Sequence, residues 1–433
     1  MPRPLIAVIS QGCAANFGEG EQIAGVLKAL DLNIVFGIPE SRPSAYLLNF
    51  CTVKGNASAL KLVRNAEERH PDTPLIITGC VPQDLSKALN DLLLKNVFPE
   101  SLQTDKNRLL ENPQSILDFL GLKRAPEYSV SAATALREKP FLGIVPISEG
   151  CLDACSYCST RLVKGLHRSI EEEIILEKIS AFVNDGCKEI FLTGQDTGCY
   201  GFDRKTNLAK LVKKILKYVP GDYKLRLGMG NPRHLIHYYR ELLDVFSDSR
   251  VYKFIHLPVQ SGSDAVLKLM NRRHSTEEYR KLVKAFQTQI PDICLSTDLI
   301  VGFPGESERD FEMSLALVRE TEPSLCNITR FVARPGTPAA KMQNKVSAAE
   351  ANRRSALLSA EFQAIALRNN QKFIGNKEMI LIEKEGFRKG TTIGRNGSYR
   401  PVALQGACVP GTQISVEITG AETFALLAKE CTL

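Results

Sequence analysis

Strand-like and helix-like segments alternate regularly between Phe141 and about Arg334, and this alternation restricts the fold more than any other feature of the sequence. Six apolar stretches predict β-strands, at Phe141–Ser148, Glu189–Thr193, Tyr223–Leu227, Phe254–Leu257, Ile293–Val301 and Leu325–Phe331. Helical spacing predicts helices between them, at Ser169–Asp185, Asn207–Tyr218, Pro232–Phe246, Thr276–Thr288 and Glu308–Thr321. Parallel strands need long crossover connections, which helices provide. We therefore expect an α/β fold whose centre is an open or partial (β/α)6 barrel, over residues 137–368.

The N-terminal part of the chain repeats the alternation, and each predicted strand there leads to a cysteine. Pro4–Ser10 precedes Cys13, Ala45–Phe50 precedes Cys51, and Pro74–Thr78 precedes Cys80, with helical spacing over Glu19–Leu30 and Ala57–Arg69. This pattern predicts a separate parallel α/β domain over residues 1–112. Ligand sites in open parallel sheets form at the carboxyl ends of the strands, so we expect these three cysteines to share one edge.

The pattern changes after a basic helical segment, Lys341–Asn370. Strand-like stretches then alternate with turns that contain glycine, at Glu378–Glu383, Tyr399–Leu404, Thr412–Thr419 and Phe424–Lys429. Short, evenly spaced strands of this kind predict a small antiparallel β-barrel over residues 371–433.

Length and composition narrow the class of protein. A chain of 433 residues suggests roughly two to four domains, and 44% hydrophobic with 24% charged residues excludes a disordered chain. No apolar run approaches the roughly 20 residues that cross a bilayer, and the N-terminal apolar run is too short for a secretion signal. We therefore expect a cytoplasmic protein without a membrane partner. A cytosolic chain with 12 cysteines more often binds metal or does redox chemistry than forms a disulfide framework. The net charge of +7 permits a nucleic-acid partner without requiring one.

The strongest local signal is the Cys-x3-Cys-x2-Cys spacing of Cys151, Cys155 and Cys158, directly after a predicted strand. Three thiolates on one tight loop can ligate three irons of a cubane iron–sulfur cluster, which leaves the fourth iron open to an exogenous ligand. The alternatives are incidental cysteines or a structural zinc site. Zinc normally needs four closed protein ligands, and His167 is the conceivable fourth ligand.

This loop resembles the signature of the radical S-adenosylmethionine (SAM) enzymes. The resemblance implies a [4Fe–4S] cluster whose open iron chelates SAM, and reductive cleavage to a 5′-deoxyadenosyl radical. It also implies SAM contacts from the strand ends that follow the loop: Tyr157 and Gly302 near the adenine, Gly194, Gln195 and Asp196 near the methionine amino group, and Arg226 at the methionine carboxylate. Close backbone approach at the glycines suits this role.

The two sets of three cysteines together resemble the methylthiotransferase family throughout the chain. The local contexts are Gln11-Gly12-Cys13, Asn49-Phe50-Cys51 and Thr78-Gly79-Cys80. The resemblance implies that Cys13, Cys51 and Cys80 hold a second, auxiliary [4Fe–4S] cluster that carries a sulfur species, and that all six cysteines are catalytic. It also implies a C-terminal TRAM domain that binds RNA. The alternative for Cys13, Cys51 and Cys80 is three buried, hydrophobic-like thiols.

Four stretches resemble the archaeal and eukaryotic threonylcarbamoyladenosine branch of that family: Gly150–Cys158, Gln195–Gly201, Leu257–Asp264 and Arg334–Pro338. The branch inserts a methylthio group at C2 of N6-threonylcarbamoyladenosine (t6A) at position 37 of tRNA, giving ms2t6A. Gln195 departs from the branch, where an acidic residue is expected. Eukaryotic members carry a C-terminal membrane tail, and because this chain ends at Leu433 without one, we expect a soluble archaeal member.

Other substrates and one other class of protein remain open. The same enzyme class acts in other branches on isopentenyladenosine in tRNA or on an aspartate of a ribosomal protein. A protein of another class would use the clusters for RNA binding or redox sensing without radical chemistry. That protein would not cleave SAM, whereas each of the methylthiotransferases would release 5′-deoxyadenosine.

Basic residues of the C-terminal segment indicate the partner. They are Lys384, Arg388, Lys389, Arg395 and Arg400, and they interleave with Phe387 and Tyr399. Basic groups follow phosphates, and aromatic rings stack on unpaired bases, such as those of the anticodon loop of a t6A-bearing tRNA. The alternative is a solvated charged surface with ordinary core aromatics. The chemistry also needs a sulfur donor and an electron donor, neither of which the sequence identifies.

Overall fold

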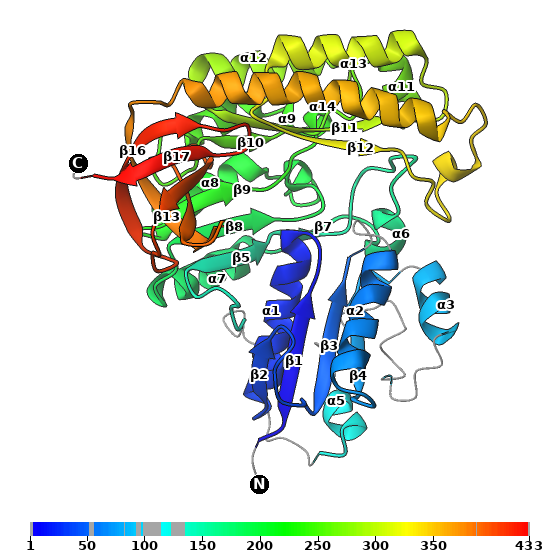
Figure 1. Ribbon diagram of the computed structural model, residues 1–433, viewed down its shortest axis with the longest axis vertical. Helices are drawn as coiled ribbons and strands as arrows, with labels where there is room; N and C mark the ends of the chain where they lie inside the picture. Colours follow the sequence, from blue (N-terminus) through cyan, green and yellow to red (C-terminus); the bar gives the residue numbers. More distant parts are fainter. Residues whose placement is uncertain are drawn as a thin grey trace.

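The computed structural model describes residues 3–51, 56–81, 83–91, 97, 114–122, 135–386 and 388–431. Figure 1 shows three parts: an N-terminal sheet with helices, a central set of strands covered by helices, and a small C-terminal barrel. The N-terminal part and the C-terminal barrel contact different regions of the central part.

The N-terminal part is a four-stranded parallel sheet of order β2-β1-β3-β4. Its strands are β1 (Leu5–Ser10), β2 (Asn33–Phe36), β3 (Ala45–Phe50) and β4 (Leu75–Gly79). Its helices are α1 (Ala14–Ala29), α2 (Asn56–Arg69), α3 (Gln83–Asp91) and α5 (Gln114–Phe119). The short strand β2 was not predicted. Helix α5 lies beyond the expected boundary at residue 112, and its Ile116 and Leu117 are buried in the core of this sheet.

Six parallel strands form the central part and confirm the expected partial barrel. They are β5 (Leu142–Pro146), β8 (Glu189–Thr193), β9 (Lys224–Leu227), β10 (Phe254–His256), β11 (Cys294–Val301) and β12 (Leu325–Arg330). Strands β5, β8 and β9 make one sheet, and β10, β11 and β12 make the other. A parallel bridge between Leu225 and Val251, together with the Gly230 amide donating to the His256 carbonyl at 3.0 Å, joins the two sheets.

Helices cover the outside of these strands, as the alternation predicts. They are α7 (Glu172–Asn184), α8 (Leu208–Tyr218), α9 (Pro232–Leu235), α10 (Tyr239–Val245), α11 (Asp264–Leu269), α12 (Thr276–Gln289), α13 (Glu308–Thr321) and α14 (Ala348–Gln371). Capping boxes at Ser275 and Ser307 explain where α12 and α13 begin. The single helix expected over 232–246 is divided into α9 and α10, and the short helix α11 was not predicted.

The C-terminal part is a closed barrel of order β13-β14-β15-β17-β16. Its strands are β13 (Lys377–Glu385), β14 (Thr391–Arg395), β15 (Pro401–Gln405), β16 (Gln413–Ala421) and β17 (Leu426–Glu430). Strand β14 was missed because Ile393 is its only large apolar residue. The barrel is not wholly antiparallel as expected, since β15 and β17 pair in parallel.

This barrel packs against the end of the central part where the parallel strands begin. The Tyr399 ring lies 4.9 Å from the Tyr252 ring and 5.2 Å from the Phe254 ring, measured between centroids. The Lys253 amide donates to the Gly397 carbonyl at 2.9 Å. Because Tyr252, Lys253 and Phe254 stand at the start of β10, the barrel closes the N-terminal end of the strands. Among the described residues, no helix has the length and apolar composition to cross a bilayer.

A buried carboxylate at this contact makes the attachment of the barrel sensitive to pH. The Glu189 carboxylate accepts hydrogen bonds from the hydroxyls of Tyr252 (3.3 Å) and Tyr399 (3.4 Å). Burial raises its pKa to about 7, and the charge of Glu383 adds to this effect, although Arg226 and Arg395 oppose it. The folded-state pKa lies above the ordinary value, so Glu189 contributes stability at low pH that is lost as pH rises toward and through about 7.

We expect thermal stability to fall between pH 5.5 and pH 8, and Glu189→Gln to flatten that slope. The amide oxygen can accept from one tyrosine and the amide nitrogen can donate to the hydroxyl of the other, while no charge is buried; over this pH range the effect is at most about 2 kcal/mol. Thermal unfolding followed across this pH range measures it. Glu173→Gln, at an exposed position on α7, is the control that should leave the slope unchanged. An equally steep slope in Glu189→Gln would contradict the assignment.

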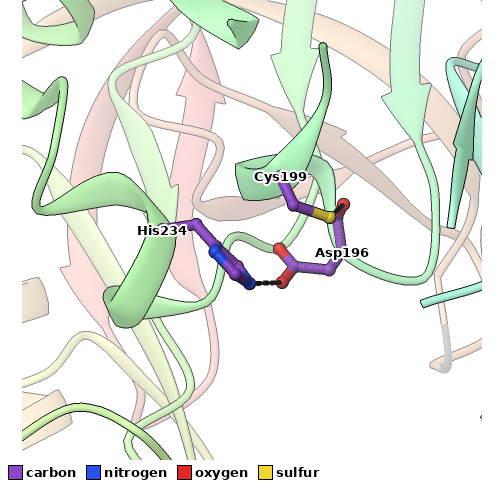
Figure 2. Close-up of side chains that lie close together, drawn as sticks. All are labelled: Asp196, Cys199 and His234. Carbon is purple, nitrogen blue, oxygen red and sulfur yellow. Dashed lines mark hydrogen bonds and ion pairs between the residues drawn. The ribbon is translucent and has the colours of Figure 1, made fainter. Parts of the chain in front are cut away.

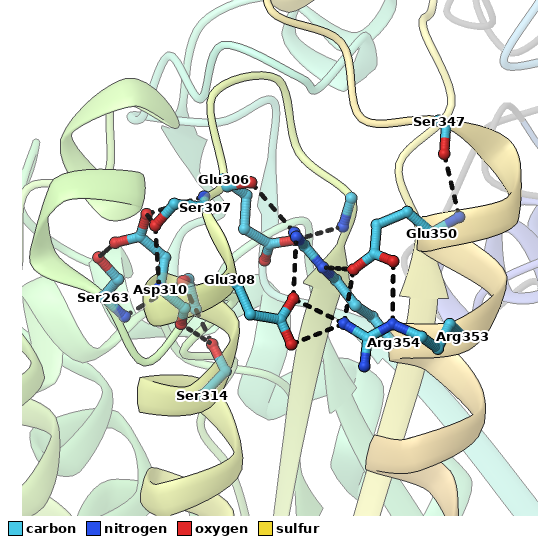
Figure 3. Close-up of polar contacts among 12 residues, drawn as sticks. Ser263, Glu306, Ser307, Glu308, Asp310, Ser314, Ser347, Glu350, Arg353 and Arg354 are labelled. Atoms are coloured by element: carbon cyan, nitrogen blue, oxygen red, sulfur yellow. Dashed lines mark hydrogen bonds and ion pairs between the residues drawn. The ribbon is translucent and has the colours of Figure 1, made fainter.

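Helix α14 is fastened to the central strands by one buried guanidinium (Figure 3). Arg354 donates to the Glu306 carboxylate at 2.8 Å and to the Glu350 carboxylate at 2.7 Å, and the side chains of Arg354 and Glu306 are only 6% and 0% exposed. Glu306 in turn accepts from the Gly302 amide at 2.6 Å. Helix α14 therefore fixes the turn that follows β11.

Arg354→Met should lower the thermal unfolding temperature by several degrees. Removing one partner of a buried ion pair leaves an uncompensated buried charge, which costs about 3 kcal/mol or more. Arg353→Met is the matched control on the next residue of α14, because Arg353 is half exposed in its ion pairs with Glu308 and Glu350 and its loss should change stability little. Equal effects of the two substitutions would contradict this interpretation.

Candidate functional site

The loop with Cys151, Cys155 and Cys158 lies where the central strands end. It follows β5 and the two-residue strand β6 (Ser148–Glu149), and it leads into the short helix α6 (Thr160–Lys164). The Cys158 amide donates to the Cys155 carbonyl at 3.1 Å, which closes a tight turn. Gly150 has φ +66°, and a Cβ there would lie 2.0 Å from the Leu166 carbonyl oxygen, so only glycine fits this start of the loop.

Burial keeps the thiols of Cys151 and Cys155 in this loop protonated as long as no metal ion is bound. Burial raises the pKa of the Cys151 thiol to about 12, and the Asp196 carboxylate adds to the effect. Burial also raises the pKa of Cys155, although the Arg272 guanidinium, which donates to the Cys155 sulfur at 3.7 Å, opposes this. Thiols of such high pKa ionise when a metal ion replaces their protons. The Thr160 amide, 3.4 Å from the Cys158 sulfur, is a further donor to a thiolate.

Asp153, between the first two cysteines, anchors the loop to the segment after β9. Its carboxylate accepts from the Asn231 side-chain amide, from Arg233, and from His234 Nε2 at 2.9 Å. Burial alone would raise the pKa of Asp153, but the hydrogen bond and charge of His234 and the charge of Arg233 hold it well below its ordinary value. The loop is thus held in place by a carboxylate that stays ionised.

A second carboxylate, Asp196, stands in the same network. Its Oδ1 accepts from the amides of Gly198 (2.9 Å) and Asn231 (3.0 Å), and its Oδ2 lies 3.6 Å from His234 Nε2. Figure 2 shows Asp196, Cys199 and His234 side by side. Their ligand atoms lie within 4.8 Å of one another, a spacing that a metal ion could use.

Each of these three side chains already has protein partners, so we interpret them as a hydrogen-bonded network. His234 pairs with Asp153, and the Cys199 sulfur donates to the Asp196 carbonyl at 3.3 Å and lies 3.4 Å from His167 Nδ1. The other ring nitrogen of His167 lies 3.1 Å from the Ser169 hydroxyl. Both nitrogens of His167 are therefore engaged away from the cysteine loop, and His167 does not complete a zinc site there.

The structure also brings together Cys13, Cys51 and Cys80. Cys13 directly precedes α1, and Cys51 and Cys80 directly follow β3 and β4. A hydrogen bond between the Cys13 and Cys51 sulfurs raises the pKa of Cys13 above its ordinary value, and burial and the nearby Cys80 raise it further. Gly12 has φ +110°, and a Cβ there would lie 2.1 Å from Cys51 Cβ.

Asn16 links the three strand ends that carry these cysteines. Its side-chain amide donates to the carbonyls of Phe50 and Gln11, the latter at 3.2 Å, and its Oδ1 accepts from the Cys80 sulfur at 3.7 Å. Asn49 donates to the Asn16 carbonyl at 2.5 Å. Three thiols gathered around one asparagine at one sheet edge are a suitable donor set for an iron–sulfur cluster with an open iron.

Several buried polar atoms beside the central loop have no partner within the described part of the chain. They are Ser148 Oγ, Gln195 Oε1 and Arg272 Nε. Buried polar groups without partners are rare in folded proteins, so these atoms fit a polar ligand at this edge. A Cβ at Gly194 would lie 2.7 Å from Ser148 Oγ, which leaves the backbone there open to close approach. These groups suit the amino and carboxylate groups of SAM.

Tyr157 and Gly302, the two residues expected near the adenine, are connected by Phe303. Tyr157 packs edge-on against Phe303 with ring centroids 6.4 Å apart, and Phe303 follows Gly302, whose φ is +73°. Val266 and Met270 contribute to the same apolar cluster. These side chains offer an apolar surface beside the cysteine loop.

Arg226 is not brought together with these residues. Its guanidinium lies over the rings of Phe191 (3.9 Å), Phe254 (4.9 Å) and Tyr399 (4.5 Å), and is therefore directed toward the C-terminal barrel. The arginine that the structure places at the cysteines is Arg272, which contacts the Cys155 sulfur and was not predicted from the sequence.

The five basic residues expected to bind RNA fall into two groups. Lys384, Arg388 and Lys389 are exposed around the turn between β13 and β14. Arg395 is paired with Glu383 at 3.0 Å, and Arg400 is buried, donating to Asn370 and Ser324 at 2.7 Å each.

The structure does not place the second group, Arg395 and Arg400, on an open surface as the RNA prediction requires. Arg395 pairs with Glu383 within the barrel, and Arg400 is buried between the barrel and the central part, so both guanidinium groups already have protein partners. Tyr399 packs against the central strands rather than facing a base, and Phe387 lies outside the described residues.

Comparisons with known proteins define the class first. Residues 145–318 match the Radical SAM superfamily, and residues 5–98 match the uncharacterized protein family UPF0004. A solved structure of the radical S-adenosylmethionine methyltransferase TsrM from Kitasatospora setae, with tryptophan and a SAM analogue bound, superposes with a TM-score of 0.56. It is 12% identical and covers 78% of this chain and 75% of that chain, so it shows the shared fold alone. The chain is a radical SAM protein, a class that binds a [4Fe–4S] cluster and SAM.

Relatives along the whole chain define the family. The probable threonylcarbamoyladenosine tRNA methylthiotransferase of Pyrococcus horikoshii is 36% identical over 406 residues, which are 92% of this chain and 93% of that protein. The threonylcarbamoyladenosine tRNA methylthiotransferase of Homo sapiens is 32% identical over 422 residues, which are 94% of this chain and 70% of that protein. This chain belongs to the threonylcarbamoyladenosine tRNA methylthiotransferase family.

Proposed function

We propose that this enzyme converts t6A to ms2t6A at position 37 of tRNA, by transfer of a methylthio group to C2 of the adenine. The observation that carries the proposal is the pair of cysteine sets, each gathered at the carboxyl ends of parallel strands. The elements that follow them, α1 and α6, meet directly, because Lys164 at the end of α6 is paired with Glu19 of α1 at 2.7 Å. Family membership supports the substrate, and the cytoplasm, where tRNA is modified, is the matching location.

In the central site, Cys151, Cys155 and Cys158 would hold the cluster that radical SAM proteins share. When bound, this cluster supplies the electron that cleaves SAM. Asp153 positions the loop through His234, and Arg272 neutralises charge on Cys155 while its unpartnered Nε offers a donor to the methionine carboxylate. Gly194, Gln195 and Asp196 would receive the methionine amino group. Tyr157 and Phe303, beside Gly302, would shield the adenine from water.

In the N-terminal site, Cys13, Cys51 and Cys80 would hold the auxiliary [4Fe–4S] cluster. Three protein thiolates leave one iron for a sulfur ligand, which is the group to be transferred. Asn16 and Asn49 hold the strand ends so that the three sulfurs face one another. Gly12 keeps the backbone clear of Cys51.

The C-terminal barrel is the proposed surface for the anticodon stem and loop, through Lys384, Arg388 and Lys389. Reversing all three to glutamate should weaken tRNA binding and reduce the slope of log affinity against log salt by roughly 2, since each phosphate contact contributes just under one unit. Affinities measured at several salt concentrations test this. The control reverses Lys210, Lys213 and Lys217 on the exposed face of α8, with the same change in charge. An unaltered slope in the barrel variant would remove this surface from the proposal.

The test of the function is an anaerobic reconstitution. Protein loaded with iron and sulfide receives SAM, a reductant, a sulfur source and t6A-bearing tRNA, and the digested nucleosides are analysed by mass spectrometry. A methylthio adduct on t6A supports the proposal. An adduct on isopentenyladenosine tRNA or on a ribosomal-protein aspartate, supplied in parallel, would reassign the substrate. Absence of both 5′-deoxyadenosine and an adduct, with both clusters present, would favour a non-radical iron–sulfur protein.

A further inference from the structure

One buried ion pair joins the two cysteine sites, although its partners are 145 residues apart in the sequence. Lys164 Nζ lies 2.8 Å and 2.7 Å from the two carboxylate oxygens of Glu19, and the side chains are 6% and 9% exposed. Glu19 stands in α1, in the second turn after Cys13. Lys164 ends α6, six residues after Cys158. The pair therefore lies between the two sets of cysteines.

The surroundings of Lys164 are anionic when the cysteines ligate a metal. Besides Glu19, the groups that act on its charge are the sulfurs of Cys80 and Cys13. A lysine ammonium has three donors, so Glu19 does not exhaust them. A buried ion pair is seldom worth more to stability than apolar residues of similar size, because both charges must leave water. Stability is therefore a weak reason for a lysine here, and a ligand of opposite charge is a stronger one.

The contact between α1 and the central strands holds this lysine in place. Gly18, beside Glu19, is packed so closely that a Cβ there would lie 2.9 Å from the Ile144 side chain on β5. Two residues further along α1, Glu21 accepts from the Glu138 amide at 3.0 Å. With α1 fixed at this distance, Glu19 holds the Lys164 ammonium at the contact between α1 and α6, where the charges of Cys80 and Cys13 also act on it.

We propose that Lys164, oriented by Glu19, binds the anionic sulfur species at the auxiliary site of Cys13, Cys51 and Cys80. The ligand class is hydrosulfide or a small thiolate. The proposal rests on the proposed function, because it assigns to this chain a residue that retains the sulfur before transfer. A single positive charge in a dry site attracts such an anion more strongly than the same charge in water. Glu19 is a positioning residue, since it acts through Lys164.

The test measures sulfur binding rather than turnover. The full chain is prepared with Cys151, Cys155 and Cys158 replaced by alanine, so that the iron signal belongs to the N-terminal site. Sodium hydrosulfide is titrated anaerobically, and the electron paramagnetic resonance spectrum of the reduced cluster reports binding. Lys164→Met should weaken the binding of hydrosulfide at least tenfold, and it should shift the reduction potential of the N-terminal cluster to more negative values. Lys164→Arg, which keeps the charge, should restore most of the affinity.

Lys178→Met is the matched control. Lys178 is also a buried lysine facing a glutamate of α1, since it lies close to Glu21, but Cys13 and Cys80 are not among the groups that act on it. The Lys178→Met variant should bind hydrosulfide with the same affinity as the protein that keeps this lysine. Glu19→Gln should weaken binding less than Lys164→Met, because the ammonium remains.

Two outcomes would overturn the inference. One is equal hydrosulfide affinity in Lys164→Met and the unchanged protein. The other is loss of the N-terminal iron in Lys164→Met while Lys178→Met retains it, because Lys164 would then serve to hold the site together. Either result leaves the proposed function standing if the unchanged protein forms ms2t6A. Conversely, charge-dependent hydrosulfide binding without any methylthio product would refute the proposed function and keep the sulfur site.

Discussion

Cys155→Ala should abolish the release of 5′-deoxyadenosine from SAM. Two protein ligands hold a cubane cluster poorly, and Cys155 is also the sulfur that Arg272 contacts, so its loss removes a cluster ligand and one of the two partners of a buried guanidinium. We expect a fall of at least a hundredfold in the yield of 5′-deoxyadenosine, measured by liquid chromatography after anaerobic reduction. Iron per chain should fall toward the content of a single cluster.

Cys408→Ser is the control for this result. Cys408 lies in the C-terminal barrel, outside both sets of cysteines, and is half-buried, so its substitution should change neither the iron content nor the yield. A normal yield of 5′-deoxyadenosine from Cys155→Ala would remove the central loop from the radical chemistry.

Cys51→Ala should separate the cleavage of SAM from the insertion of sulfur into the tRNA. The central cysteines are untouched, so 5′-deoxyadenosine should still form, while the methylthio product should fall below detection because the transferred sulfur has no site. Cys51 is buried beside Gly12, so the smaller alanine fits the same space. The measurement is the ratio of ms2t6A to 5′-deoxyadenosine in one reaction mixture.

The control for this variant is Cys294→Ala, at another buried cysteine that starts a central strand. It should keep the ratio of the unchanged protein even if it lowers stability. Formation of ms2t6A by Cys51→Ala at the normal ratio would show that the transferred sulfur does not depend on the N-terminal site.

The strands of this protein could be predicted from the sequence because their signal is local. The predicted stretch Glu189–Thr193 coincides with β8, and β11 and β12 begin and end within a residue of expectation. The proximity of Cys13, Cys51 and Cys80 could be predicted from one rule, that the carboxyl ends of parallel strands meet at the same edge of a sheet. Strand β2 was missed because it has only four residues, and β14 because Ile393 is its only large apolar residue, so tertiary pairing decides their conformation.

The supporting residues of the site could not be predicted, because their partners come from distant segments. Asp153 receives His234 from 81 positions away, and Arg272 reaches Cys155 across 117 positions. Nothing in the local sequence of either arginine distinguishes Arg226, which stacks on aromatic rings, from Arg272. Arg400 failed as an RNA contact for a similar reason, since charge patterning does not reveal that Asn370 and Ser324 surround it.

The position of the C-terminal barrel decides from which side of the central strands reactants can approach. The barrel closes the end of the core where the strands begin, and Tyr399 fills that end with an aromatic ring between Tyr252 and Phe254. The loop with Cys151, Cys155 and Cys158 lies at the opposite end, where the strands finish. Under the proposed function, the reactants therefore approach from the side that the barrel leaves uncovered, and the barrel need not move during the reaction.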